Sequence, residues 1–198
     1  LGYMFFAAGV GAYNSSIFHL MTHAFFKAIL FLCAGSVIHA MHNEQDMRKM
    51  GGLSKKLPIT TVLMWVGSLA IIGFPLMSGY YSKESILESS YYSGTSIGMF
   101  AYFEGIVKAV FKAFYSWRLL MMTFHGNHHA TEETINQIHE SPKVMIISLA
   151  ILAIGTIFSG SILADFFIGS KQEVFWNHAL VLIHTTHHNI QVSRFKDL

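Results

Sequence analysis

Long apolar runs alternate with short polar segments along the chain. The run at 143–168, KVMIISLAILAIGTIFSGSILADFFI, has no charged residue between Lys143 and Asp165. About 20 consecutive apolar residues are enough to cross the hydrocarbon core of a bilayer as a helix, and a soluble core helix of that length is unusual. The pattern therefore predicts helices that span a membrane.

The apolar runs predict an all-α fold, a polytopic transmembrane helix bundle in which one helix is discontinuous. The expected elements are a partial helix at 1–13 and spans near 17–42, 58–92, 97–124 and 143–168. These helices would occupy residues 1–170, and the histidine-rich residues 171–198 would form an extramembrane loop or a truncated tail. Because the chain begins inside an apolar run without an initiator methionine, we expect it to be a piece of a longer protein.

The segment 58–92 is too long for one straight crossing of a bilayer. Gly73, Pro75 and Gly79 interrupt its helical pattern. A proline inside a helix removes a backbone hydrogen bond and clashes with the preceding turn. We therefore expect a helix that is broken partway, with two ionisable residues just past the break.

Charged residues make up 12% of the chain, about half of the roughly 25% that is typical of soluble domains. The net charge is only +2, and no basic patch with interleaved aromatic residues is present, so we expect no nucleic-acid partner. The single cysteine, Cys33, lies in an apolar run, where a cysteine usually packs as a small core residue. Because the sequence has no nucleotide-binding fingerprint and no cysteine pair, we expect no cofactor and no metal in this chain.

Basic residues in short loops indicate which side of a membrane a loop faces. Four of them crowd the loop 43–57, whereas the connection after Glu88 has none before Lys108. This asymmetry places the loops 43–57 and 125–142 on the cytoplasmic or matrix side.

His19, His23 and Lys27 recur at four-residue spacing, so they lie along one face of a helix. Lys27 falls close to the middle of its span, where a charged lysine is costly unless it is paired or hydrated. Burial favours the neutral form of an amine, and histidine titrates near neutral pH. The three side chains therefore have the chemistry of a proton relay.

Two simpler interpretations of His19 and His23 stay open. They could be ordinary buried histidines that are satisfied by hydrogen bonds. They could also bind a metal ion, although no third ligand lies nearby in the sequence.

Lys83 and Glu84 follow the expected break in the segment 58–92. Broken helices are tolerated at membrane depth only where they are buried in protein or line water, so a titratable lysine there suggests an ion pathway. The alternative is that both residues mark the water interface after a short helix.

Glu104, Lys108 and Lys112 also repeat at four-residue spacing, in the span 97–124. A structural ion-pair network is the simplest interpretation. A helix face that lines a hydrated crevice is the alternative.

Further histidines cluster in the polar segments, where weak surface metal binding or no role is more plausible than catalysis. They are His125, His128, His129, His139, His184, His187 and His188.

The segment 18–53, FHLMTHAFFKAILFLCAGSVIHAMHNEQDMRKMGGL, resembles the antiporter-like membrane subunits of NADH:quinone oxidoreductase (respiratory complex I), of the type called subunit 5, or chain L in bacteria. FPLMSGYYSKESIL at 74–87 and FYSWRLLMMTFHG at 114–126 agree with that family as well. The motifs occur in the family's order, and the resemblance covers roughly residues 1–170.

The resemblance implies roles for five residues. Lys27 matches the lysine at the centre of the family's proton channel, and His19 and His23 match the histidines that precede it. Lys83 matches the lysine at the discontinuous helix on the exit side, with Glu84 in the acidic position beside it. The implied path runs from the two histidines through Lys27 towards Lys83.

The resemblance also implies a setting. The subunit would translocate protons as part of an NADH:quinone reductase, without redox chemistry of its own, while other subunits bind NADH, FMN, iron–sulfur clusters and quinone. Its partners would be other membrane-arm subunits and the lipid bilayer of a bacterial inner membrane or a mitochondrial inner membrane. The family's buried glutamate with its partner lysine, and its long lateral helix, would lie outside this chain.

Two rival functions share some of these features. The large subunit of a multisubunit Na⁺/H⁺ antiporter has the same lysine and broken-helix design without redox coupling. A metal transporter would use the histidines instead.

Overall fold

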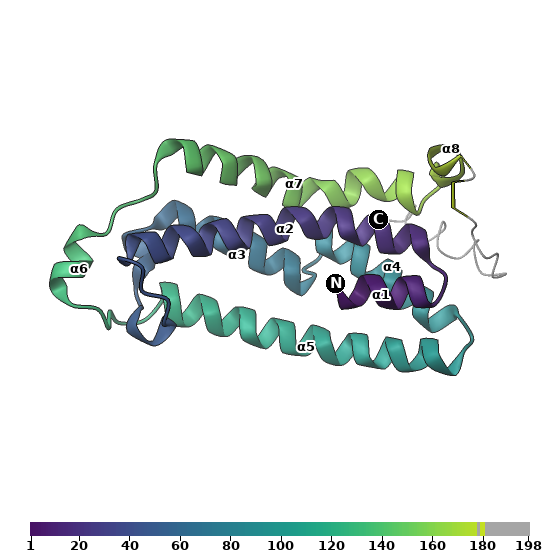
Figure 1. The fold of residues 1–198 in the computed structure, drawn as a ribbon, viewed down its shortest axis with the longest axis horizontal. Helices are drawn as coiled ribbons and strands as arrows, with labels where there is room; N and C mark the ends of the chain where they lie inside the picture. The colour runs from purple at the N-terminus through teal and green to yellow at the C-terminus, as the bar shows by residue number, and fades with distance from the viewer. Residues whose placement is uncertain (178, 181–198) are drawn as a thin grey trace.

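The computed structural model describes residues 1–177, 179 and 180, which form helices and connecting loops without a strand. The predicted all-α fold is confirmed. The α-helices are α1 (Gly2–Gly9), α2 (Tyr13–Ala40), α3 (Pro58–Ile72), α4 (Ser78–Tyr92), α5 (Ser96–Phe124), α6 (Glu132–Gln137), α7 (Lys143–Phe167) and α8 (Gln172–Trp176). Figure 1 shows the long helices side by side along the longest axis of the molecule, with α2 packed against α3, α4 and α7.

Two of the described helices, α2 and α7, are long and apolar enough to cross a membrane. Helix α5 has 29 residues, which is also a sufficient length, but it carries the charged residues discussed below. Each of α3 and α4 has 15 residues and is too short to cross alone. Together, α3 and α4 occupy the segment 58–92.

Helix α2 starts four residues earlier than the span expected near 17–42. The first turn is polar in sequence, but its side chains find partners inside the bundle. Asn14 donates to Gln172 at 3.1 Å, and the Ser15 hydroxyl lies 2.7 Å from that of Ser85. Buried polar groups persist when they are hydrogen-bonded, which explains why the helix extends through this turn.

The discontinuity lies at residues 73–77, between α3 and α4. Gly73 ends α3 in the left-handed conformation (φ 94°), which favours glycine. Helix α4 then starts so close to the end of α3 that a Cβ at Gly79 would lie 1.9 Å from the Ala70 carbonyl oxygen. The break is therefore built on two glycines, one for a turn and one for a close approach.

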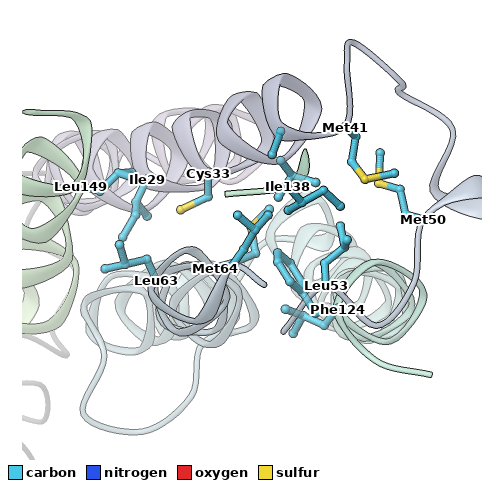
Figure 2. Packing of buried hydrophobic residues seen from close by; sticks show 14 of the residues in the cluster. Ile29, Cys33, Met41, Met50, Leu53, Leu63, Met64, Phe124, Ile138 and Leu149 are labelled. Atoms are coloured by element: carbon cyan, nitrogen blue, oxygen red, sulfur yellow. The ribbon is translucent and has the colours of Figure 1, made fainter. Parts of the chain in front are cut away.

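The largest apolar core lies at one end of the bundle (Figure 2). The second half of α2 contributes Ile29, Cys33 and Val37, which are buried against side chains of α3, α5 and α7. Cys33 is a fully buried free thiol, as its apolar surroundings in the sequence predict. Tight van der Waals packing of this kind is the main source of helix association in lipid.

The loops 43–57 and 125–142 meet at that end of the bundle. The Gly52 amide donates to the His125 carbonyl at 3.1 Å, and the His129 amide donates to the Met50 carbonyl at 3.3 Å. Both loops thus lie at the same end of the bundle.

A carboxylate from the second loop caps helix α3. Glu140 accepts the Ile59 amide at 2.7 Å and both the amide (3.2 Å) and the hydroxyl (2.9 Å) of Thr60. The first amides of a helix lack partners within it, and the helix dipole favours an anion there. Glu140 therefore joins the loop 125–142 to the start of α3.

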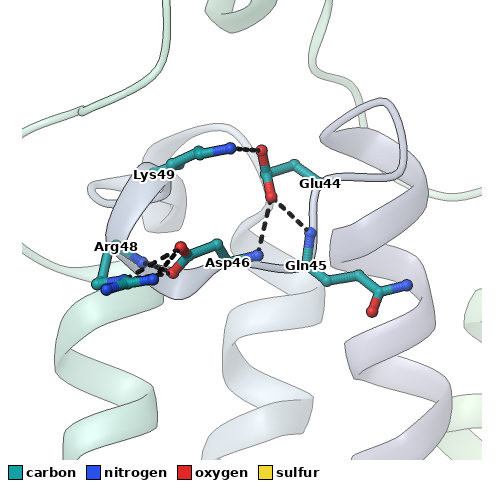
Figure 3. A network of polar contacts seen from close by, with 5 residues as sticks. All are labelled: Glu44, Gln45, Asp46, Arg48 and Lys49. Carbon is teal, nitrogen blue, oxygen red and sulfur yellow. Dashed lines mark hydrogen bonds and ion pairs between the residues drawn. The ribbon is translucent and has the colours of Figure 1, made fainter.

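A second polar network lies within the loop 43–57 (Figure 3). Lys49 donates to Glu44 at 2.7 Å, and Arg48 holds the Asp46 carboxylate through both of its oxygens at 2.7–3.0 Å. The hydrogen bonds from the Arg48 side chain and backbone amide lower the pKa of Asp46 to about 2. These exposed contacts shape the loop but are worth little stability.

Candidate functional site

His19 lies at the centre of the polar interior, where α1, α2 and α4 meet. It is 1% exposed, and its Nδ1 lies 2.9 Å from the Ser82 hydroxyl of α4. The Tyr3 ring of α1 is next to it, with centroids 5.8 Å apart. Helix α2 thus presents a titratable ring to two other helices.

Hydroxyl groups continue the hydrogen bonds around His19. The Thr22 hydroxyl donates to the Ser82 hydroxyl at 2.8 Å, and the Ser82 hydroxyl donates to the Ser78 carbonyl at 3.3 Å. One turn earlier on α2 and one turn later on α4, the hydroxyls of Ser15 and Ser85 bond each other at 2.7 Å. A hydroxyl can both donate and accept a hydrogen bond. The hydrogen bonds in this seam between α2 and α4 can therefore run in either direction.

His23 and Lys27 follow His19 on the same face of α2. The rings of His19 and His23 lie 5.8 Å apart, and His23 is half-buried. Lys27 is also half-buried, and its ammonium lies 5.2 Å from the centre of the Phe31 ring. Among the described residues, no carboxylate forms an ion pair with Lys27.

Lys83 is the most buried of the candidate amines, at 5% exposed. Its Nζ donates to the Ile71 carbonyl in the last turn of α3, and its stem lies against Gly73. The break leaves the last carbonyls of α3 without helical partners, and the negative end of the helix dipole favours a cation there. The break between α3 and α4 and the buried amine of Lys83 thus form one site.

Glu84 lies beside a hollow of about 460 Å³ between α1, α3, α4 and α5. Lys83, Glu88 and Tyr3 also line this hollow. It is large enough to hold several waters, and its polar groups supply partners for them. Lys83 therefore lies between the hydroxyl seam and a polar hollow.

The three charged residues of α5 do not form one network. Glu104 and Lys108 make an ion pair at 2.5 Å, as the spacing predicts. Lys112 is not in an ion pair with any described residue. Its ammonium instead lies 4.4 Å from the centre of the Tyr3 ring, which corrects the interpretation of all three as one ion-pair network.

The structure adds residues that the sequence argument did not single out. Ser82, Thr22 and Tyr3 contact His19 or its partners, yet none is ionisable near neutral pH. A signal was present for the hydroxyls, because Ser78, Ser82, Ser85 and Ser89 recur at three- and four-residue spacing along α4. No comparable signal exists for Tyr3, because its contacts depend on how α1 packs.

The other histidines lie at the loop end or outside the described residues. His125 contacts Trp65 (centroids 6.1 Å apart), and His129 bonds the Met50 carbonyl. His184, His187 and His188, like most of the expected tail, fall outside the described part of the chain. Among the residues that are described, no three His, Cys, Asp or Glu side chains come together as potential metal ligands.

The sequence matches two family models in succession. The model described as NADH:quinone oxidoreductase/Mrp antiporter, TM, covers residues 1–111. The model described as NADH dehydrogenase subunit 5 C-terminus covers residues 115–183.

Individual proteins agree with this assignment. NADH-ubiquinone oxidoreductase chain 5 of Dictyostelium discoideum is 52% identical over 179 residues, which cover 90% of this chain and 27% of that protein. NADH-quinone oxidoreductase subunit L of Rhodobacter capsulatus is 48% identical over 188 residues, covering 89% and 26%. The chain thus spans about a quarter of the length of these curated relatives.

A solved structure supports the fold. A chain of the membrane-bound sulfane sulfur reductase, an archaeal respiratory membrane complex, matches with a TM-score of 0.67 over 86% of this chain and 26% of that chain. At 23% identity, this match shows the fold alone. The two family models and the named relatives show that the chain is part of an integral membrane protein that belongs to the NADH:quinone oxidoreductase/Mrp antiporter family, in the branch of NADH dehydrogenase subunit 5.

Proposed function

We propose that this chain is part of a proton-translocating subunit in the membrane arm of an NADH:quinone oxidoreductase. The observation that carries the proposal is the Lys83 amine, buried at the break between α3 and α4 and bonded to a helix-end carbonyl instead of a carboxylate. Burial without a counter-charge disfavours the charged form of an amine, which makes such an amine suited to releasing a proton. A structural lysine would more often be paired.

The proposed path starts at His19 and His23 and passes through Lys27 to Lys83. His19 contributes a ring that is hydrogen-bonded across to α4 at Ser82, the residue directly before Lys83. Each step moves one proton between a ring nitrogen, a hydroxyl, an amine or water, without any change in oxidation state. Glu84 would receive the proton at the hollow beside Lys83.

The driving force would come from outside this chain. NADH, FMN, iron–sulfur clusters and quinone would be bound by other subunits of the complex, which are also the proposed partners of this one. Relatives carry the names NADH-ubiquinone oxidoreductase chain 5, in Dictyostelium discoideum, and NADH-quinone oxidoreductase subunit L, in Rhodobacter capsulatus. We therefore propose a mitochondrial or a bacterial inner membrane as its location.

The test uses the full-length subunit within its native complex, reconstituted into vesicles. Lys27→Ala and Lys83→Ala should each lower proton pumping and the coupled quinone reductase activity while the complex still assembles. Lys143→Ala is the matched control, because Lys143 is exposed at the start of α7. Unchanged pumping in both path variants, at normal assembly, contradicts the proposal.

A second candidate function is the large subunit of a multisubunit Na⁺/H⁺ antiporter. The description of the family model that matches residues 1–111 names Mrp antiporters together with the oxidoreductase. The two functions differ in what drives transport. NADH-driven quinone reduction by the purified complex supports the first, and Na⁺-driven proton movement without NADH supports the second.

A further inference from the structure

Three charged residues lie together where the middle of α5 meets the start of α1. Glu104, Lys108 and Lys112 repeat at four-residue spacing, so they share one face of α5. Lys108 and Glu104 form an ion pair at 2.5 Å, and their side chains are 41% and 36% exposed. Lys112 forms no ion pair with any residue of the described part of the chain. This face therefore carries one positive charge that nothing in that part balances.

The Lys112 side chain does not carry its charge to the surface of a bilayer. It starts near the middle of the 29-residue helix α5, and its ammonium lies 4.4 Å from the centre of the Tyr3 ring. The Tyr3 hydroxyl donates to the Gly105 carbonyl at 2.5 Å, which fixes the ring against the same helix. A lysine at this depth is costly against lipid unless it is paired or hydrated. Lipid alone is therefore a poor cover for this face of α5.

The outer face of α7 has the opposite composition. Between residues 147 and 162, its large exposed side chains are all apolar. They are Ile147, Ile151, Ile154, Phe158 and Ile162. Lipid tails are as apolar as these side chains and can cover them without cost. Of these two outer faces, only that of α5 requires a polar partner.

The rest of the same protein can supply that partner. The chain spans about a quarter of the length of its curated relatives, so in a protein of their length about three quarters of the residues lie outside it. We propose that the face of α5 around Lys112 is a docking surface for a membrane segment of the same protein from outside this chain. That segment supplies an Asp or Glu carboxylate, which pairs with the Lys112 ammonium.

Charge and shape both favour this occupant. One carboxylate balances the one unpaired charge of the face, and a charge-assisted hydrogen bond to an ammonium is stronger than a neutral one. The same segment would cover Phe111, which is 65% exposed and lies three residues after Lys108 on the same face. The inference goes beyond the proposed function, because it concerns how the subunit is built and holds whichever ion it moves.

A photo-crosslinker at position 111 tests what covers this face. Phe111 is replaced by p-benzoylphenylalanine in the full-length subunit within its native complex, and the crosslinked peptides are identified by mass spectrometry. We expect a crosslink to a segment of the same subunit outside residues 1–198, with an Asp or Glu within about two helical turns of the crosslinked residue. The same probe at Phe158, an exposed phenylalanine of α7, is the matched control and should capture lipid. Capture of lipid alone, or of another subunit alone, from position 111 overturns the proposal.

A charge reversal then tests the ion pair. Lys112→Glu replaces attraction by repulsion and should lower the amount of assembled complex about tenfold, because a buried charge without its partner is strongly destabilising. Replacing the Asp or Glu of the crosslinked segment by Lys in the same protein should restore most of the assembly. Lys143→Glu, the same reversal at an exposed lysine of α7, should assemble normally.

Two results of the charge reversal overturn the proposal. One is normal assembly of Lys112→Glu, and the other is a loss of assembly that no reversal in the crosslinked segment restores. Both the crosslink and the amount of assembled complex are measured without proton pumping. A failure here therefore leaves the proposed function intact, and normal pumping in Lys27→Ala and Lys83→Ala leaves this inference intact.

Discussion

The two halves of helix α2 pack in opposite ways. The second half buries Ile29, Cys33 and Val37 in an apolar core with α3, α5 and α7. The first half buries His19 and Thr22 against hydroxyls of α4. One continuous helix thus joins an apolar end, which fixes the arrangement of the bundle, to a polar end, which holds groups that can exchange protons.

This difference predicts which residues should matter for stability and which for proton transport. At the apolar end, close packing of α2 with side chains of α3, α5 and α7 fixes the positions of the helices. At the polar end, each hydrogen bond involves a group that can change partners, and the helices stay in register because the apolar end holds them. Mutations where two helices approach closely should therefore impair assembly of the complex. Mutations at the polar end should impair proton transport.

The largest effect is expected at the junction of α3 and α4. Gly79→Ala would place a methyl group 1.9 Å from the Ala70 carbonyl, so the two half-helices must separate. We expect most of the assembled complex to be lost, as measured by native gel electrophoresis of membranes. Gly35→Ala is the matched control, because no atom lies within 4 Å of a Cβ there. Normal assembly of the Gly79 variant would contradict the close approach.

A smaller effect is expected within the polar end. Ser82→Ala removes the hydroxyl that bonds both His19 and Thr22, leaving a buried ring without that partner at a cost of about 1–3 kcal/mol. Proton pumping per NADH oxidised should fall several-fold while the amount of assembled complex stays normal. Ser148→Ala, at an exposed serine of α7, should change neither quantity. Equal pumping by Ser82→Ala and Ser148→Ala would show that the hydroxyl seam takes no part in proton transport.

The cap of α3 should affect stability alone. Glu140→Ala removes the acceptor for two amides and a hydroxyl at the start of α3, and a lost helix cap typically costs about 1 kcal/mol. We expect a lower thermal unfolding temperature of the purified complex, measured by differential scanning fluorimetry. Pumping per complex should stay at the wild-type value, and a parallel loss of pumping would show that the apolar end is not purely structural.

The smallest effect is expected in the exposed loop 43–57. The pKa of Asp46 is lowered from 3.8 to about 2, so its contribution is fully present above pH 3.8 and is lost as the pH falls towards 2. Pumping between pH 6 and 8 should therefore not depend on this group. Asp46→Ala should speed hydrogen exchange of the Arg48 amide, which donates to Asp46, and leave transport unchanged.

Much of the fold follows from the sequence because bilayer spans and helix breaks are local features. The runs of apolar residues indicate the helices, and Gly73 with Pro75 indicates the discontinuity. Lys27 and Lys83 stand out for the same reason, since an amine in an apolar run needs an explanation. The assignment of these amines to a proton path stays a prediction.

The remaining features depend on contacts between distant segments. The His19–Ser82 bond spans 63 residues and requires the register between α2 and α4. Helix α1 places an aromatic ring against each of Lys108 and Lys112, Phe6 and Tyr3, and this packing is not visible in the periodicity of α5. Periodicity places residues on a helix face, but it does not say which partner that face meets.

The cap on α3 has a consequence for how the protein is made. Glu140 follows the amides that it caps by 80 and 81 positions, and α4 and α5 are synthesised in between. During translation, the first amides of α3 therefore lack this acceptor until Glu140 has been synthesised. The cap at the start of α3 can form only after the loop 125–142 has been made, so this helix end depends on a later part of the chain.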